Sequence, residues 1–181
     1  NSLEGSVNDT LALLIREPRT LIRQEMVLPI EHCLLVKPGT DTTAIGAIYS
    51  HPQALAQCRN FLERCFPKAQ LVAALSTAAA VEEMMKTSLT SAAIGPKRAA
   101  VLWGAQILAR GIQDYNPNLT RFVVLATTDH PPTNSDKTSF CFSFAEDRPG
   151  LLVSVLQEFA SRDINLAKVE SRPSKESLGK Y

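Results

Sequence analysis

The sequence predicts an α/β protein with a mainly parallel sheet, followed by a smaller second unit. Through residues 1–128, short apolar runs alternate with stretches of helical periodicity, a pattern typical of strand–helix–strand units. Residues 129–136, Asp-His-Pro-Pro-Thr-Asn-Ser-Asp, form a turn-rich break. Residues 137–181 then open on a phenylalanine-rich run. We therefore expect two domains joined by a linker.

In the first part, the elements follow from the spacing of apolar residues and from the residues that flank them. A helix is expected after Asn8-Asp9-Thr10, any of which could cap it, with apolar positions as far as Ile22. Extended segments are expected at 27–36, broken by Pro29, and at 44–49. The next helix has apolar residues at the i, i+3, i+4, i+7 spacing, namely Leu55, Cys58, Phe61, Leu62 and Cys65. Strands at 71–75, 91–94 and 121–127 and helices at 78–86 and 97–104 complete this part.

Two of these strands run directly into a helix start, at Ser50-His51-Pro52 and at Ser76-Thr77. In parallel α/β sheets, ligands bind beyond the carboxyl ends of the strands. A helix N-terminus there presents free N–H groups and a positive dipole end. Together with Arg121, two such ends predict an anion site, suited to a ligand with two carboxylates.

The second part reads as a strand, a helix and a strand. Residues 138–145 contain Phe140, Phe142 and Phe144, and the turn Asp147-Arg148-Pro149-Gly150 places proline at a helix start. One apolar stripe of the helix consists of Leu152, Val155, Leu156 and Phe159. A strand is expected at 164–170. Such a βαβ unit is marginal alone and needs a continuation or a partner.

Composition excludes several classes of function. The net charge of +1 gives no support for a nucleic-acid or membrane-surface partner. The longest apolar runs span about seven residues, where a membrane span needs about 18. The four cysteines contain no CxxC pair, so we expect core thiols in a reducing, cytoplasmic compartment, with a disulfide or metal role as the alternative.

Specific strings then indicate a family. Asn1-Ser2-Leu3-Glu4-Gly5-Ser6-Val7 resembles the Glu-Asn-Ser-x-Glu-Gly-Ser-Val segment of prephenate dehydratases, entered one residue late. In the family's order follow Leu28-Pro29-Ile30 with His32, Ser50-His51-Pro52-Gln53-Ala54-Leu55-Ala56-Gln57-Cys58, Ser76-Thr77-Ala78 and Asn118-Leu119-Thr120-Arg121-Phe122. Residues 137–173 resemble the ACT regulatory domain that follows in this family, including Glu170-Ser171-Arg172-Pro173. The resemblance departs at Leu151, where the family has alanine.

This resemblance implies a two-lobed catalytic domain, akin to periplasmic binding proteins, and then a ferredoxin-like ACT domain. Measured against it, the first segment of the first lobe and the second half of ACT are not in this sequence, so we expect the chain alone to be inactive. The implied reaction converts prephenate to phenylpyruvate, carbon dioxide and water in phenylalanine synthesis, without metal or organic cofactor. Arogenate dehydratase, and a non-catalytic anion-binding sensor of the same fold, are the alternatives. An upstream chorismate mutase domain stays possible.

The matched positions supply the candidate site. We expect Thr120 to donate a hydrogen bond to the departing oxygen and Arg121 to bind a carboxylate; the alternatives are a plain strand residue and a surface salt bridge. Ser50, expected to cap its helix, and Asn1 complete the catalytic set. The expected substrate-binding residues are Ser2, Gln57, Ser76 and Thr77, with simple exposure as the alternative for Gln57. His51 and Glu4 are weaker candidates for an acid.

The ACT positions imply regulation. Phenylalanine would bind at an interface between two ACT domains, which predicts a homodimer or homotetramer. The expected effector-binding residues are Pro149, Gly150, Leu151, Leu152, Glu170, Ser171, Arg172 and Pro173; an ordinary strand end is the alternative.

Overall fold

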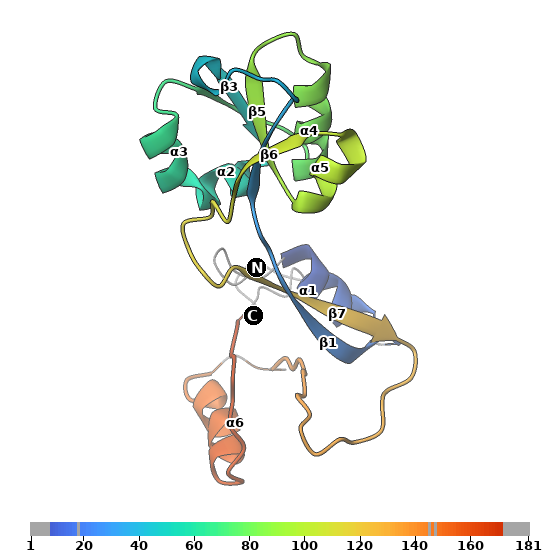
Figure 1. The fold of residues 1–181 in the computed structure, drawn as a ribbon. Helices are drawn as coiled ribbons and strands as arrows, with labels where there is room; N and C mark the ends of the chain where they lie inside the picture. The colour runs from blue at the N-terminus through green and yellow to red at the C-terminus, as the bar shows by residue number, and fades with distance from the viewer. Residues whose placement is uncertain (1–7, 18, 145, 147, 172–181) are drawn as a thin grey trace. The chain divides into compact units, whose positions relative to one another are not determined.

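Residues 8–130 build a five-stranded sheet between two layers of helices, together with a separate two-stranded ribbon (Figure 1). The computed structural model describes residues 8–17, 19–144, 146 and 148–171. The chain divides into two units between His130 and Pro131, and each is described by itself. In the first unit the helices are α1 (Asn8–Arg16), α2 (Pro52–Gln57), α3 (Arg59–Cys65), α4 (Thr77–Lys86) and α5 (Lys97–Trp103), with a 3₁₀ turn η1 at Thr42–Ala44. Its strands are β1 (Leu21–Pro29), β2 (Cys33–Val36), β3 (Ala47–Ser50), β4 (Gln70–Ala73), β5 (Ser91–Gly95), β6 (Gln106–Arg110) and β7 (Leu119–Ala126).

The five-stranded sheet has the order β4-β3-β5-β2-β6. Strand β3 is parallel to β4 and β5, whereas β2 is antiparallel to both β5 and β6. Four strands therefore run in one direction and β2 runs against them. The prediction of a mainly parallel sheet is right for those four. It missed the reversed strand, because β2 enters the sheet from the ribbon at the edge where its neighbours end.

The core lies on both faces of this sheet. Leu34 and Val36 belong to the apolar cluster that includes Ala54, Cys58 and Leu62 of the α2–α3 layer. Alternate residues of the same strand, Cys33 and Leu35, belong to the cluster formed with α4 and α5, for example Val81, Met84 and Ala100. Side chains alternate between the faces of a strand, so a strand covered on both sides is apolar throughout.

Most expected elements of this unit are confirmed. Helix α5, for example, ends at Trp103, and its C-cap Gly104 has a φ of 64°, the left-handed conformation typical of helix ends. The differences concern three elements. The helix expected across Cys58 is two helices, because the backbone at Cys58 leaves helical geometry. Ile22 lies in β1, not in the first helix. The sequence interpretation also missed β6, a run of three apolar residues that follows the Gly104 stop.

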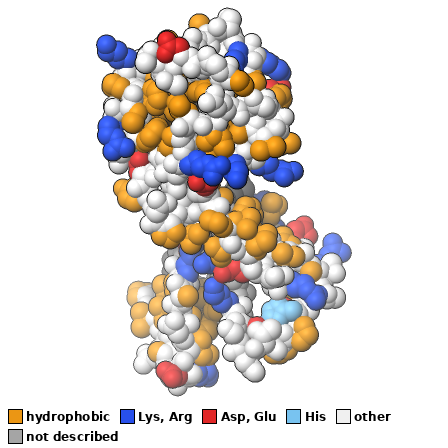
Figure 2. Space-filling model, in the orientation of Figure 1, with side chains coloured by type: hydrophobic (Ala, Val, Ile, Leu, Met, Phe, Trp, Pro, Cys, Tyr) orange, Lys and Arg blue, Asp and Glu red, His pale blue; other side chains and the backbone are white. Residues whose placement is uncertain are grey.

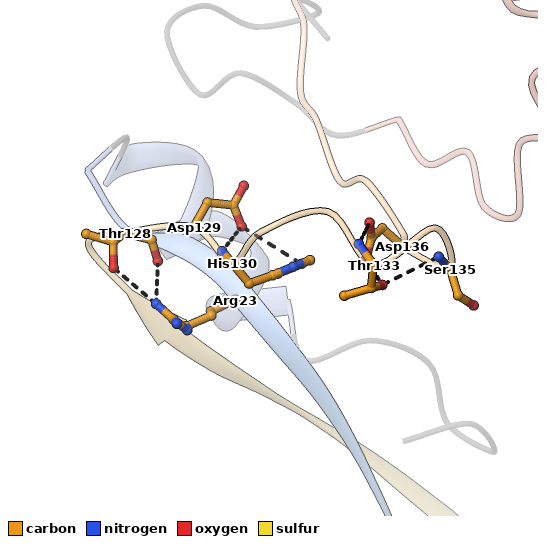
Figure 3. A network of polar contacts seen from close by, with 7 residues as sticks. All are labelled: Arg23, Thr128, Asp129, His130, Thr133, Ser135 and Asp136. Atoms are coloured by element: carbon orange, nitrogen blue, oxygen red, sulfur yellow. Dashed lines mark hydrogen bonds and ion pairs between the residues drawn. The ribbon is translucent and has the colours of Figure 1, made fainter.

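The ribbon pairs β1 with β7 in antiparallel register, from Leu21 opposite Ala126 to Pro29 opposite Leu119. Near its far end the Arg23 guanidinium donates to Thr128, at 3.1 Å to the hydroxyl and 3.4 Å to the carbonyl oxygen (Figure 3). Many apolar side chains of the ribbon are exposed in the described part of the chain (Figure 2). They include Met26, Val27, Leu28, Phe122, Val124 and Leu125.

The second unit contains α6 (Leu151–Ala160), as expected. Gly150, with a φ of 88°, is its N-cap and Leu151 its first residue. Pro149 therefore lies one position before the N-cap, outside the helix, and not at the helix start as predicted. The Phe140 ring stacks on Phe159 of the helix, with ring centroids 5.3 Å apart. The strands expected at 138–145 and 164–170 are not formed among the described residues. In a split βαβ unit the two strands flank a third, and the described residues 131–171 supply no such strand.

In the described part of the chain, none of the helices could span a lipid bilayer.

The packing between β5 and α4 predicts the effect of one substitution. A Cβ on Gly95 would lie 2.9 Å from Val81 Cγ2 and 3.3 Å from Leu35 Cδ1. We expect Gly95→Ala to lower the free energy of unfolding by about 1–3 kcal/mol, as overpacking does. Gly46→Ala is the control, since no atom lies within 4 Å of its added Cβ. Urea unfolding of both variants measures the difference, and equal midpoints would contradict the packing described.

Candidate active site

The carboxyl ends of four strands meet at one edge of the five-stranded sheet. Strand β3 ends at Ser50, β4 at Ala73, β5 at Gly95 and β6 at Arg110. Two connecting segments pass this edge on their way between sheet and ribbon: residues 30–32, which lead into β2, and residues 111–118, which lead out of β6. The edge is where ligands bind in open α/β sheets.

Backbone hydrogen bonds join the two connecting segments to each other. The Ile30 N–H donates to the Asn118 carbonyl at 2.8 Å, and the Ile112 N–H donates to the His32 carbonyl at 3.1 Å. The His32 N–H in turn donates to Gln113 Oε1 at 3.1 Å. Pro29, Ile30, Glu31, Gly111, Gln113, Asn116, Pro117 and Asn118 line an open hollow of about 550 Å³ beside them. The two segments therefore form one paired crossing.

Three buried polar residues, which we call the amide cluster, meet at this crossing: His32, Gln57 and Asn118, with exposed fractions of 7%, 9% and 4%. His32 Nε2 lies 2.8 Å from Gln57 Oε1, and Asn118 Nδ2 donates to the same oxygen at 3.1 Å. Since a side-chain carbonyl oxygen only accepts, His32 Nε2 carries the proton. Gln57 is therefore buried, and the alternative that its side chain is simply exposed to solvent is wrong.

The backbone after Gln57 is also tied to the crossing. The Asp114 N–H donates to the Gln57 carbonyl at 2.7 Å. The Asp114 carboxylate accepts from the Asn60 N–H, at 3.2 and 3.1 Å to its two oxygens, in the first turn of α3. The carboxylate therefore caps the N-terminus of α3. The N-cap residue of that helix, Cys58, makes no side-chain hydrogen bond to it. Sequence reasoning missed this role, because Asp114 is far from the helix along the chain.

Two thiols report the electrostatics of the site. Burial raises the pKa of Cys58 to about 12, with a further contribution from the Asp114 charge. Burial also raises the pKa of the Cys33 thiol, as does the charge of Glu31, while Arg110 and Lys97 oppose the rise. Two cations therefore lie near the start of β2, at the carboxyl edge of the sheet. Lys and Arg side chains gather along the lower edge of this lobe (Figure 2). The sequence interpretation did not include them.

Ser50 does not cap its helix, which corrects the prediction. His51 is the N-cap of α2, and its Nδ1 accepts from the Gln53 N–H at 3.2 Å. Ser50 is fully buried at the end of β3, and its hydroxyl donates to the Ile94 carbonyl at 2.8 Å. The hydroxyl therefore ties β3 to β5. Ser76 caps α4 as expected, accepting from the Ala79 N–H at 3.0 Å, and Thr77 is the first residue of that helix.

Thr120 and Arg121 are adjacent in β7, so their side chains point to opposite faces of the ribbon. Thr120 is half-buried and lies opposite Leu28. Arg121 is largely exposed and forms an ion pair with Glu25, with Nε 3.3 Å from the carboxylate. The surface salt bridge, left open as the alternative for Arg121, is the contact that the structure records.

The remaining candidates lie in the second unit or outside the described residues. Glu170 forms an ion pair with Lys168 at 2.7 Å, and Ser171, Pro149, Gly150 and Leu152 are exposed. Leu151 is half-buried at the start of α6. Asn1, Ser2, Glu4, Arg172 and Pro173 lie outside the described residues. Within the residues that the structure describes, no three His, Cys, Asp or Glu side chains are grouped to hold a metal ion.

Comparison with known proteins relates this geometry to a family. The sequence model of prephenate dehydratase matches residues 1–130, and that of the ACT domain matches residues 141–181. The chain belongs to the prephenate dehydratase family. A prephenate dehydratase from Methanocaldococcus jannaschii is 42% identical over 185 residues, covering all of this chain and 66% of that protein. Arogenate dehydratase 5, chloroplastic, from Arabidopsis thaliana is 45% identical over 177 residues, covering 96% of this chain and 41% of that protein.

A solved structure of the family has the same fold. The prephenate dehydratase from Arthrobacter aurescens, crystallised in complex with L-Phe, superposes with a TM-score of 0.81 at 31% identity, covering 98% of this chain and 60% of that one. The predicted fold class, a two-lobed α/β domain like the periplasmic binding proteins followed by an ACT domain, is confirmed. The chain spans between 41% and 66% of the length of these three relatives.

The burial of Cys58, the residue after Gln57, predicts how slowly its thiol reacts. A buried thiol with a pKa of about 12 stays protonated at pH 8, and the thiolate is the nucleophile. We expect iodoacetamide to modify the exposed Cys65 and Cys141 at least about tenfold faster than Cys58, read by peptide mass spectrometry. Protein unfolded in urea is the control. Equal rates in the folded protein would contradict the burial.

Proposed function

We propose that the protein containing this chain is a prephenate dehydratase, which converts prephenate to phenylpyruvate, carbon dioxide and water in phenylalanine synthesis. Residues 1–128 would belong to its catalytic domain, 129–136 to a linker and 137–181 to its ACT domain. The family match supports the proposal. The position of Gln57, which belongs to the family string 50–58, also supports it. His32 and Asn118 hold the side-chain oxygen of Gln57 at the edge of the sheet where ligands bind.

The reaction needs little from the protein. The bond between the ring and its carboxylate breaks, and its electron pair enters the ring as carbon dioxide leaves. At the opposite ring carbon, the bond to the hydroxyl oxygen breaks. That oxygen takes one proton from solvent water and departs as water. The ring becomes aromatic, which supplies the driving force. The enzyme must hold two carboxylates, orient the ring and assist the departing oxygen.

We assign the last task to Thr120, in agreement with the motif that contains it. Its hydroxyl is a poor acid near neutral pH, so it would donate a hydrogen bond to the departing oxygen. Thr120 lies two residues after Asn118 of the amide cluster and is half-buried. Gln57, Ser76, Thr77 and the cation Arg121 stay proposed donors to the carboxylates. The proposed catalytic Ser50 would first have to leave the Ile94 carbonyl; Asn1 and Ser2 complete the proposed set.

Regulation by phenylalanine belongs to the same proposal. The Arthrobacter aurescens relative was crystallised with L-Phe. In the present protein, phenylalanine would bind beside the Pro149-Gly150 turn and the 170–173 segment, between two ACT domains. The protein would then be a homodimer or homotetramer. We propose a cytoplasmic location, which fits the four free cysteines.

Substituting Thr120 tests the proposed activity. In the full-length protein we expect Thr120→Val to lower kcat on prephenate about 100-fold or more, because one transition-state hydrogen bond is lost. Thr127→Val, outside β7, is the control. Phenylpyruvate absorbance measures turnover, with arogenate as a parallel substrate. Parent protein that binds prephenate without forming product would favour the sensor alternative, and much faster turnover of arogenate would overturn the assignment.

Substituting Glu170 tests the proposed regulation. A carboxylate there suits the ammonium group of phenylalanine, so Glu170→Gln should raise the Kd for L-phenylalanine about tenfold, as loss of a charge-assisted hydrogen bond does. Glu158→Gln is the matched control, since Glu158, on α6, also forms an ion pair, with Arg162 beyond the end of that helix. Calorimetric titration of the full-length protein measures both. Identical Kd values for the two variants would remove Glu170 from the effector site.

A further inference from the structure

We infer that His32 and Asn118 are positioning residues: both hold the side-chain oxygen of Gln57, so that the NH₂ group of Gln57 is directed to a carboxylate of the substrate. The inference rests on the proposed function and adds two residues and one orientation to it. It is carried by the contacts of the amide cluster.

The two hydrogen bonds to Gln57 make its amide asymmetric. A glutamine side chain has an oxygen that accepts and a nitrogen that donates. His32 Nε2 and Asn118 Nδ2 both approach the oxygen, at 2.8 and 3.1 Å. Rotating the amide by half a turn would set its NH₂ group against these two donors. The cluster therefore selects one of the two amide orientations.

The nitrogen of the Gln57 amide is available to a ligand. Gln57 Nε2 has no hydrogen-bond partner among the described residues, and no fully buried side-chain nitrogen or oxygen of those residues lacks a partner. Nε2 therefore reaches the accessible surface while the rest of the residue is buried. A neutral donor pair at that position can bind a carboxylate oxygen of a dianionic substrate.

The three residues come from segments that are distant in the sequence but locked in place. His32 lies in one connecting segment, Asn118 in the other, and Gln57 ends α2. The backbone carbonyl of each residue also accepts a hydrogen bond. The donors are the N–H groups of Ile112 to His32, Ile30 to Asn118 and Asp114 to Gln57. Because all three residues are more than nine-tenths buried, water competes little for these bonds and the amide has few other orientations.

A purely structural role would not require this arrangement. Burying three polar side chains is costly unless each is hydrogen-bonded, and apolar residues would fill the same volume more cheaply. The cluster instead lies at the carboxyl edge of the sheet, where ligands bind in such folds, and its last member precedes Thr120 by two residues. The arrangement fits a device that aims one amide.

The test uses steady-state kinetics on prephenate with the full-length protein. Gln57 would contact the carboxylate in both ground and transition states, so disturbing it should raise KM more than it lowers kcat. We expect Asn118→Asp, which sets an oxygen against Gln57 Oε1, and His32→Leu each to raise KM about tenfold. His32→Gln, which retains a donor near the same place, should keep KM within about twofold of the parent. Gln70→Glu, an exposed amide-to-acid change at the start of β4, is the charge control.

Coupling separates positioning from a merely structural role. In a Gln57→Ala background, His32→Leu and Asn118→Asp should raise KM no further, since residues that act through a third one are not additive with it. Full additivity in that background would overturn the inference, whatever the thermal stability of the variants. A parent protein that does not turn over prephenate would overturn the proposed function instead.

A second measurement needs no variant to fold. In ¹⁵N NMR spectra of the parent protein, the neutral His32 ring should be the Nε2–H tautomer, as donation to Gln57 Oε1 requires. The Nδ1–H tautomer would mean that Gln57 donates through its nitrogen, and would contradict the inference even if the enzyme is active.

Discussion

The paired crossing of two connecting segments is the constraint on which the rest of this structure depends. Both passages between the five-stranded sheet and the ribbon go through it, and backbone hydrogen bonds at 2.8 and 3.1 Å hold them together. At the crossing, the three buried polar residues of the amide cluster are hydrogen-bonded to one another. A buried polar group without a partner costs about 1–3 kcal/mol, so these three residues stabilise the crossing only as a set.

The same constraint places the chemistry. Strand β2 must run against its neighbours because it enters from the crossing, and this brings its first residue to the edge where the other four strands end. Gln57, Ser50 and the cations near Cys33 are thereby collected at one edge, and Thr120 follows the crossing directly. The position of the site therefore depends more on the two connecting segments, 30–32 and 111–118, than on any one helix N-terminus.

Much of this could be predicted from the sequence, for reasons that differ by residue. Helices α4 and α5 and strand β5 follow from local signals, such as Ser76 as a cap and Gly104 as a stop. The break at Cys58 and the ion pair of Arg121 could not, because Asp114 and Glu25 act across long stretches of chain. Ser50 looked like a cap until the fold set its hydroxyl against the Ile94 carbonyl. The strands expected in the second unit need a neighbour that residues 131–171, as described, do not provide.

A crystal structure of the full-length protein with a bound dicarboxylate analogue of prephenate would test the proposed role of the amide cluster most directly. We expect Gln57 Nε2 within about 2.7–3.2 Å of a carboxylate oxygen of the ligand, while His32 and Asn118 still contact Gln57 Oε1. A ligand bound elsewhere, or one at this edge with Gln57 turned away and the amide cluster broken, would contradict it.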